Sequence, residues 1–259
     1  MINKYAIIDS SAVIAKNVEI GPYVIVGANV EIGEGTKIFS HAVINGRTKI
    51  GRNNKIFQFA SIGADPQDLK YKNEDTLLEI GDNNIFRECC TINRGTEQGG
   101  GITRIGNNNL IMAYVHIAHD CILGNDIVLS NNTSFAGHVV VGNYAVFGGF
   151  AVIAQFCTIG AYSFIGATTG INKDVLPYTL VSSHHGPAKA YGLNTVGLKR
   201  RGFSEEKIKK IAQAYNLLCR DNGITIKEAL PKLEEMAVEC QEIRLIIDIL
   251  QKSKHGVIR

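Results

Sequence analysis

The strongest constraint on the fold is a six-residue period of large apolar residues that runs through the first two thirds of the chain. Such a residue occupies every sixth position in the ranges 2–62, 80–92 and 105–171. The residue directly after the apolar residue is often glycine. The fourth residue after the apolar residue is commonly small or β-branched, as at Thr133 and Ala145. A period of six matches neither the 3.6 residues of a helical turn nor the alternation of a free-standing sheet.

A six-residue period is typical of short strands that are joined by tight corners and wind round a prism. The apolar residue and the residue four positions later then point inward. Three such hexads make one triangular coil, so residues 18 apart are expected to lie stacked, about 4.8 Å from each other. The sequence therefore predicts a mainly β protein built on a parallel β-helix.

Two interruptions of the period predict loops that leave the coil. Across residues 64–79 the period keeps its phase, but continuing the coil there would bury Asp68 and Glu74 at a large desolvation cost. Further along, seven extra residues and a glycine-rich stretch predict a second loop near residues 93–104. Loops on a rigid scaffold often carry binding residues, so both are candidates for a functional site.

The period ends near residue 190, which predicts a coil domain over residues 1–190 and a helical domain over residues 191–259. Ser204 and Thr225 carry helix-start signals, and Gly223 is expected to stop the first of the two helices. Such a domain would cap the open end of the coil.

Composition narrows the class of protein. No apolar run approaches the roughly 18 residues of a membrane span, and no signal pattern precedes the first hexads, so we expect a cytoplasmic protein without a transmembrane segment. The six cysteines lack C-x-x-C spacing, which favours reduced thiols. The net charge is +3, and residues 197–259 hold 13 basic against 9 acidic residues. This excess suits an acidic protein or a phosphorylated ligand, and we expect no nucleic-acid partner.

The stretch HIAHDCILGN at residues 116–125 places two histidines beside an acid. The period points Cys121 inward, where it packs as a small hydrophobe and is a poor nucleophile. It points His116, His119 and Asp120 outward, which disfavours a buried packing role for the histidines. An idle surface histidine is the alternative.

Stacking singles out one of these histidines. His119, Gly137 and Gln155 are separated by 18 residues each, so they should form one column, with His138 beside Gly137. A neutral imidazole is a suitable base for a hydroxyl proton, and an unobstructed N–H at Gly137 could stabilise an oxyanion. Acyl transfer needs both groups. Asp120 could orient the imidazole, although neighbours on a strand normally point to opposite faces.

The repeat resembles the left-handed β-helix of hexapeptide-repeat acyltransferases, and the hand is implied by that resemblance. Six segments of the chain are distinctive: PQDLKY at 66–71, RGTEQGGG at 94–101, HIAHDC at 116–121, AGH at 136–138, QFC at 155–157 and GLKRRGF at 197–203. Through these segments, and over essentially its full length, the chain resembles the UDP-N-acetylglucosamine acyltransferases of lipid A biosynthesis.

The resemblance implies a homotrimer with active sites between subunits. It implies transfer of a (R)-3-hydroxyacyl group from acyl carrier protein to the 3-hydroxyl of UDP-N-acetylglucosamine, without a further cofactor and without a metal. His119 would be the general base and Gly137 the oxyanion donor. Substrate contacts are expected at Asp68, Lys70, His116, His138, Gln155, Asn194, Arg200 and Arg201, and the two arginines suit phosphate oxygens unless they only form a solvated approach to a helix.

Four positions bear on which substrates are used. Asn93, Ala154 and Val196 differ from the family pattern, in which the first two are usually histidine and the third is an acid. Some relatives use a 3-amino sugar and form an amide, so these differences leave the acceptor open. Ala167 lies where the family sets the acyl length, and its methyl group predicts a moderately long hydroxyacyl chain.

Other functions stay open at this point. A later N-acyltransferase of the same pathway carries an extra domain before its β-helix, whereas here the hexads start at Ile2. An acetyltransferase that uses coenzyme A and a β-helix that only binds partners are further candidates. A zinc carbonic anhydrase would use the three histidines and leave the column unused. The basic excess could bind acyl carrier protein through Lys207, Lys209 and Lys210.

Overall fold

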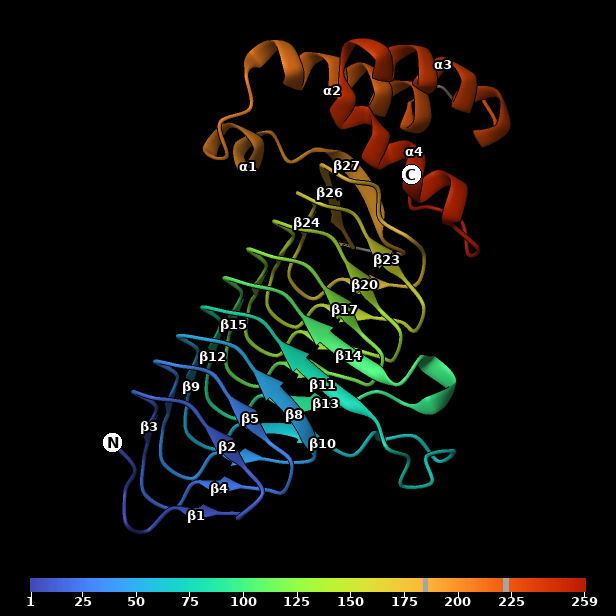
Figure 1. Cartoon of the computed structure of the whole chain (residues 1–259). Helices are drawn as coiled ribbons and strands as arrows, with labels where there is room; N and C mark the ends of the chain where they lie inside the picture. The colour runs from blue at the N-terminus through green and yellow to red at the C-terminus, as the bar shows by residue number, and fades with distance from the viewer. Residues whose placement is uncertain (184–185, 221–223) are drawn as a thin grey trace.

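The computed structural model of the chain, which describes residues 1–183, 186–220 and 224–259, is a left-handed parallel β-helix followed by helices (Figure 1). The chain passes through three sheets in turn. Strands one coil apart pair in parallel, with Ile7 opposite Ile25 and His116 opposite Ser134. This 18-residue register confirms the coil that the six-residue period predicts.

The strands sort into three sheets. The first sheet holds β1 (Ile7–Ile8), β4 (Ile25–Val26), β7 (Val43–Ile44), β10 (Ser61–Ala64), β13 (Thr91–Asn93), β16 (His116–Ile117), β19 (Ser134–Phe135), β22 (Val152–Ile153) and β25 (Gly170–Ile171). The second holds β2 (Val13–Ile14), β5 (Glu31–Ile32), β8 (Arg47–Ile50), β11 (Leu77–Ile80), β14 (Ile102–Ile105), β17 (Ile122–Leu123), β20 (Val140–Val141) and β23 (Thr158–Ile159). The third holds β3 (Glu19–Ile20), β6 (Lys37–Ile38), β9 (Lys55–Ile56), β12 (Ile85–Phe86), β15 (Leu110–Ile111), β18 (Val128–Leu129), β21 (Val146–Phe147), β24 (Phe164–Ile165), β26 (Thr179–Ser182) and β27 (Lys189–Leu193).

The interior of the coil is filled by the residues that the period points inward. Ile117 and Cys121 are both fully buried in this core. Burial of one such isoleucine side chain contributes about 1.5–3 kcal/mol to folding. Cys121 is therefore core packing, as predicted.

The coil turns at three corners that repeat along its length. We call the corner between the first and second sheets, formed by residues 119 and 120 and their equivalents in other coils, the loop-bearing corner. Its second residue has a left-handed backbone in successive coils, with φ of 62° at Asp120, 64° at His138 and 66° at Phe156. Both interruptions of the period leave the coil at this corner and project from the same side of it (Figure 1).

Both loops are shorter than the sequence predicts. The first spans residues 65–76, between β10 and β11, and the second spans residues 94–101, between β13 and β14, and contains the 3-10 turn η1 (Glu97–Gly99). The reason is that β11 and β14 pair with each other over four residues, so the strands take up chain that the period alone assigns to loops.

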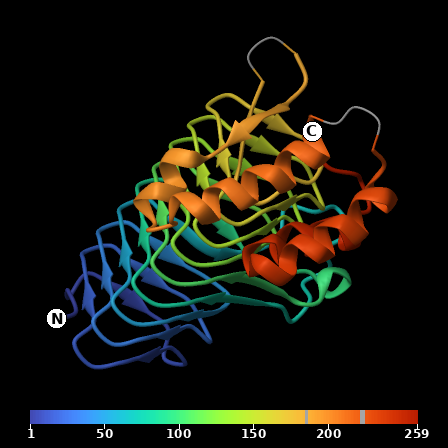
Figure 2. The same ribbon diagram turned by 90° about the horizontal axis from the view of Figure 1, so that it is seen from above.

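The helices lie across the end of the coil (Figure 2). They are α1 (Thr195–Arg200), α2 (Glu205–Cys219), α3 (Ile226–Glu239), the 3-10 turn η2 (Gln241–Ile243) and α4 (Arg244–Lys252). Ser204 caps α2, and Thr225 caps α3 in a capping box with Glu228, as predicted. The expected helix stop at Gly223 lies outside the described residues.

Two segments join the helices to the coil. Strand β27 pairs antiparallel with β26, so the predicted domain boundary at residue 190 falls inside a strand. Near the other end of the helical region, the Ile258 N–H donates to the Asp174 carbonyl over 2.8 Å, and the Ile258 side chain packs into the coil core. The helical region is thus joined to the coil near both of its ends.

Candidate active site

Three pairs of residues stack at the loop-bearing corner in successive coils: His119 with Asp120, Gly137 with His138, and Gln155 with Phe156. The His138 N–H donates to the His119 carbonyl over 3.0 Å, and the Phe156 N–H donates to the Gly137 carbonyl over 3.2 Å. The column of residues 119, 137 and 155 that the 18-residue register predicts is present.

His119 and Asp120 lie outside the coil, as predicted, yet they are buried, with 6% and 5% of their surface exposed. The second loop covers them. The Thr96 N–H donates to Asp120 Oδ1 over 2.8 Å, and the Thr96 hydroxyl donates to Asp120 Oδ2 over 2.6 Å. The outward register alone does not indicate this burial, because the register describes the coil and not the loop folded over it.

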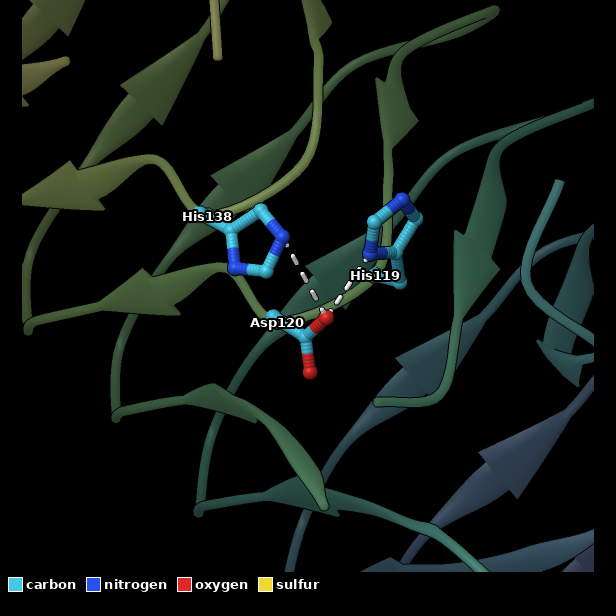
Figure 3. Close-up of side chains that lie close together, drawn as sticks. All are labelled: His119, Asp120 and His138. Carbon is cyan, nitrogen blue, oxygen red and sulfur yellow. Dashed lines mark hydrogen bonds and ion pairs between the residues drawn. The ribbon is translucent and has the colours of Figure 1, made fainter. Parts of the chain in front are cut away.

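Asp120 contacts the imidazole of His119 directly (Figure 3). His119 Nδ1 lies 2.7 Å from Asp120 Oδ2. An ionised carboxylate only accepts hydrogen bonds, so Nδ1 of a neutral His119 carries the proton and Nε2 keeps a free lone pair. The argument from strand alternation does not apply, since the left-handed backbone of Asp120 belongs to a corner and turns both side chains to the same side.

Gly137 lies against the ring of His119. A Cβ built on Gly137 would come within 2.6 Å of His119 Cε1 and 2.9 Å of Nε2. The Gly137 N–H donates no hydrogen bond to any described residue. The same holds for the N–H groups of His119 and Gln155, which occupy the equivalent position in the neighbouring coils. The repeating corner thus leaves an unused donor, and at Gly137 no side chain separates this donor from His119.

His138 completes the cluster. Its ring stacks on Phe156, with centroids 4.4 Å apart, and meets His119 edge-on at 5.2 Å. Figure 3 shows Asp120 between the two histidines, with His138 Nε2 3.8 Å from Asp120 Oδ2. Burial lowers the pKa of His138, and the Asp120 carboxylate opposes that shift. The neutral ring is favoured at physiological pH.

A cavity of about 580 Å³ opens beside this cluster. The first loop supplies Asp68 and Lys70, which the sequence predicts as substrate contacts, and the corner supplies Gln155. The full lining is Gln67, Asp68, Leu69, Lys70, Thr96, Gln98, His119, His138, Gln155 and Phe156. The sequence reasoning missed Gln67, Leu69, Thr96, Gln98 and Phe156, although all five are in or beside the matching segments.

His116 is separate from this lining. It sits on β16, where its Nδ1 lies 2.7 Å from the Thr91 hydroxyl. Burial, with a smaller contribution from the charge of His119, lowers its pKa. The structure therefore places His116 behind the site rather than among the groups that face the cavity.

The remaining expected contacts lie elsewhere on the chain. Asn194 caps α1, donates to the Tyr162 carbonyl over 3.0 Å, and thus has a structural role of its own. The guanidinium of Arg201 lies over the Tyr144 ring, at the corner between the second and third sheets, and Arg200 is exposed at the end of α1. Ala167 is exposed at the corner between the third and first sheets. Within one chain these groups do not meet His119.

Two of the unusual positions are exposed and one is buried. Ala154 and Val196 are exposed. The buried Asn93 side chain donates to the Asp65 carbonyl over 2.7 Å, while its Oδ1 has no partner among the described residues. This amide fastens the first loop to β13.

A metal centre is the main chemical alternative for the cluster. Ligand atoms of His119, Asp120 and His138 lie within 4.8 Å of one another, whereas His116 is not part of this group. Both oxygens of Asp120 already accept hydrogen bonds from Thr96, and one also contacts His119. The geometry favours a hydrogen-bonded acid–imidazole pair over the three-histidine zinc site.

Within the described part of the chain, no helix has both the length and the apolar character needed to cross a membrane.

Comparisons with known proteins agree with this architecture. A family model described as UDP N-acetylglucosamine O-acyltransferase, domain 2, matches residues 174–258, and one for bacterial transferase hexapeptide repeats matches residues 102–137. The acyl-[acyl-carrier-protein]–UDP-N-acetylglucosamine O-acyltransferase of Psychromonas ingrahamii is 60% identical over 77% of this chain and 75% of its own. That of Thiobacillus denitrificans is 48% identical over 100% of this chain and 99% of its own.

A solved structure matches equally well. The UDP-N-acetylglucosamine O-acyltransferase of Moraxella catarrhalis is 51% identical and superposes with a TM-score of 0.97, over 100% of this chain and 99% of that chain. Full-length identity of this order, on the same fold, shows the family. The chain belongs to the UDP-N-acetylglucosamine O-acyltransferases.

Proposed function

We propose that the protein transfers a (R)-3-hydroxyacyl group from acyl carrier protein to the 3-hydroxyl of UDP-N-acetylglucosamine, the first step of lipid A biosynthesis. The observation that carries this proposal is the pairing of His119 with Asp120, which leaves Nε2 free beside the unused N–H of Gly137 in a cavity. Family membership supports the choice of donor and acceptor.

The geometry suggests how the chain promotes this reaction. His119 Nε2 takes the proton of the sugar hydroxyl as the oxygen attacks the thioester carbonyl. The Gly137 N–H stabilises the oxyanion of the tetrahedral intermediate, while Asp120 stabilises the imidazolium. Collapse breaks the carbon–sulfur bond, and the imidazolium returns its proton to the leaving thiolate. All steps use side chains and one backbone N–H of the chain itself, so we expect neither a cofactor beyond the donor's phosphopantetheine arm nor a metal.

Turnover tests the proposal. The purified protein should convert the hydroxyacyl carrier protein and UDP-N-acetylglucosamine to the 3-O-acyl sugar, and His119→Ala should reduce the rate by at least about a thousandfold. Cys121→Ala is the control. It truncates a side chain only two residues away that packs in the coil core, and it should keep the rate per folded molecule. Full activity of His119→Ala would refute the mechanism.

A homotrimer is the assembly that we propose. Its support is that the expected contacts occupy three different corners, so a substrate at His119 could reach Ala167 or Arg201 only on a neighbouring copy. The outer face also exposes Ile7 by 65% and Val152 by 55%, which a partner would cover. Ultracentrifugation should give three times the chain mass. Mixed assemblies of His119→Ala and Arg201→Ala chains should regain activity if each site uses two copies.

The donor protein would dock on the helical region. Of the three lysines expected there, Lys207 is paired with Glu242, and Lys210 with Glu206 and Glu239. Lys209 is exposed and forms no ion pair with the described residues. Lys209→Glu therefore reverses a charge without breaking an ion pair, and it should raise the KM for acyl carrier protein at low salt. An unchanged KM would exclude Lys209 from the docking surface.

The acceptor and the acyl length are proposals of the same kind. We favour the hydroxyl acceptor, because the named relatives are O-acyltransferases, and a 3-amino acceptor is the alternative. Parallel assays with both sugars decide between them. Ala167→Gly should shift the preference toward longer chains if the methyl group limits the slot, and an unchanged profile would remove this role.

Six free cysteines fit the cytoplasm, where thiols stay reduced, and this is the location that we propose.

A further inference from the structure

We propose that Thr96 is a positioning residue for the reaction: it holds the Asp120 carboxylate so that neutral His119 keeps its proton on Nδ1 and presents Nε2 as the base. This inference rests on the proposed function and adds the residue that prepares its base. Thr96 belongs to the second loop, so the loop would act on the chemistry through Asp120.

The contacts that carry the proposal converge on one buried carboxylate. The Thr96 N–H reaches Oδ1 over 2.8 Å, and the Thr96 hydroxyl reaches Oδ2 over 2.6 Å. His119 Nδ1 shares Oδ2 at 2.7 Å. Because two donors from one residue hold both oxygens, the carboxylate cannot rotate without losing a hydrogen bond to an ionised group in a buried place.

Thr96 is itself fixed. Its hydroxyl oxygen accepts from the Gly99 N–H over 3.1 Å, which directs the hydroxyl proton away from the turn and toward Asp120. Its carbonyl accepts from the Gly101 N–H over 2.8 Å. On the other side, the Asp120 N–H donates to the Thr103 hydroxyl over 2.8 Å. Thr103 lies on β14, directly after the loop, so Asp120 is held both by the loop and by the strand that follows it.

Gly99 provides an independent sign that the loop is shaped around Asp120. A Cβ built on Gly99 would lie 2.0 Å from Asp120 Cγ, and its φ is not in the left-handed region, so close approach rather than backbone geometry requires glycine there. Gly99→Ala would displace the carboxylate without removing any hydrogen-bonding group.

Two variants of Thr96 separate its hydroxyl from its shape. Thr96→Val removes the hydroxyl and should lower kcat about tenfold or more, with the KM values for donor and acceptor within about twofold. Thr96→Ser keeps both donors and should restore most of kcat. Because Thr96 also lines the cavity, a rise in KM with kcat unchanged would assign it to substrate binding and overturn the proposal.

Thr133→Val is the matched control. Thr133 is a fully buried threonine whose hydroxyl donates to the Ser130 carbonyl over 2.8 Å, at the corner between the third and first sheets. Its loss should lower the melting temperature but leave kcat per folded molecule unchanged. An equal loss of kcat in this control would mean that general loosening, and not Asp120, explains the Thr96 result.

A double-mutant cycle tests the route through Asp120. If Thr96 acts only by holding this carboxylate, Thr96→Val should cost no more than about twofold in kcat when added to Asp120→Ala. A full tenfold loss in that background would show that Thr96 acts independently of Asp120. Gly99→Ala should follow the same rule, and it provides the test if Thr96→Val fails to fold.

Nitrogen NMR of histidine-labelled protein keeps the two hypotheses apart. The unmodified protein should show His119 protonated on Nδ1, and Thr96→Val should reduce that population. An unchanged spectrum would overturn the role of Thr96 even if the enzyme is fully active. Absence of acyl transfer by the unmodified protein would instead refute the proposed function, whatever the tautomer.

Discussion

Gly137 lies so close to His119 that a methyl group on it would stand 2.6 Å from His119 Cε1 and 2.9 Å from Nε2. Real Cβ contacts are never this short, so any side chain at position 137 must displace the imidazole or the corner that carries it. The absence of a side chain at Gly137 therefore does two things. It leaves room for the His119 imidazole, and it leaves the Gly137 N–H accessible beside it.

Gly137→Ala should therefore lower kcat by about a hundredfold or more, because a base moved by about an ångström no longer lines up with the hydroxyl. Steady-state kinetics with circular dichroism for folding would measure this. Gly192→Ala is the control, since a Cβ there meets nothing within 4 Å. Activity of Gly137→Ala near the unmodified level would show that the ring is not held where we describe it.

Stability should fall as the pH drops below about 6.5, and His116 should carry part of this dependence. Burial lowers the pKa of folded His116 below the ordinary value of 6.5. At a pH between the pKa of His116 in the folded protein and its ordinary pKa in the unfolded chain, the unfolded chain binds a proton that the folded chain does not. The free energy of unfolding therefore decreases as the pH falls through this range.

Melting temperatures at pH 7.5 and 5.5 check this expectation. His116→Gln should flatten the dependence, while His255→Gln, an exposed histidine near the end of the chain, controls for the substitution itself. A slope that is identical in His116→Gln and the unmodified protein would contradict the assignment.

Thiol reagents should leave the activity intact at first. Burial raises the pKa of Cys90 and Cys121 to about 12, so at pH 8 only about one thiol in ten thousand is ionised. The half-buried Cys89 should react first with a disulfide reagent in the native protein. Cys89→Ser should remove this fast phase, and rapid modification of Cys121 would show that the coil opens more readily than its packing implies.

A ladder of buried asparagines should contribute strongly to stability. Asn84 accepts from the Asn109 N–H over 2.9 Å and donates to the Gly106 carbonyl over 2.9 Å, inside the coil. Asn84→Ala leaves both groups buried and unpaired, which should cost about 2–4 kcal/mol. Asn125→Ala, on a parallel ladder at the surface, should cost less, because water can replace its hydrogen bonds. Equal effects on denaturant unfolding would refute the difference.

The coil and its column were accessible from the sequence because both follow from counting. The positions of Ile117 and Cys121 recur in every coil, so the period fixes their inward direction. By the same count, Gly137 falls 18 residues after His119. Cores and registers of a solenoid depend on nearest neighbours, and such contacts are local enough to be written into a repeat.

The burial and pairing of Asp120 were not accessible in this way. They depend on Thr96, which lies 24 residues earlier in a loop that does not follow the six-residue period. The period therefore cannot indicate that Thr96 contacts Asp120. One signal was present: Asp120 occupies the second corner position, which elsewhere holds Asn108, Asp126 and Asn132 with left-handed backbones. Asparagine and aspartate favour that conformation, so these residues mark corners and not strands.

The C-terminal residues that place Ile258 in the coil core also determine which part of the coil is completed last during synthesis. Each coil can settle on the one below it as the ribosome delivers the chain, since strand pairing needs only the preceding coil, which is 18 residues away where no loop intervenes. The uppermost coil is different, because its Asp174 waits for residues 256–258 to emerge. Until then the growing protein carries an unfinished apolar edge, and that interval is when it is most exposed to aggregation and to chaperones.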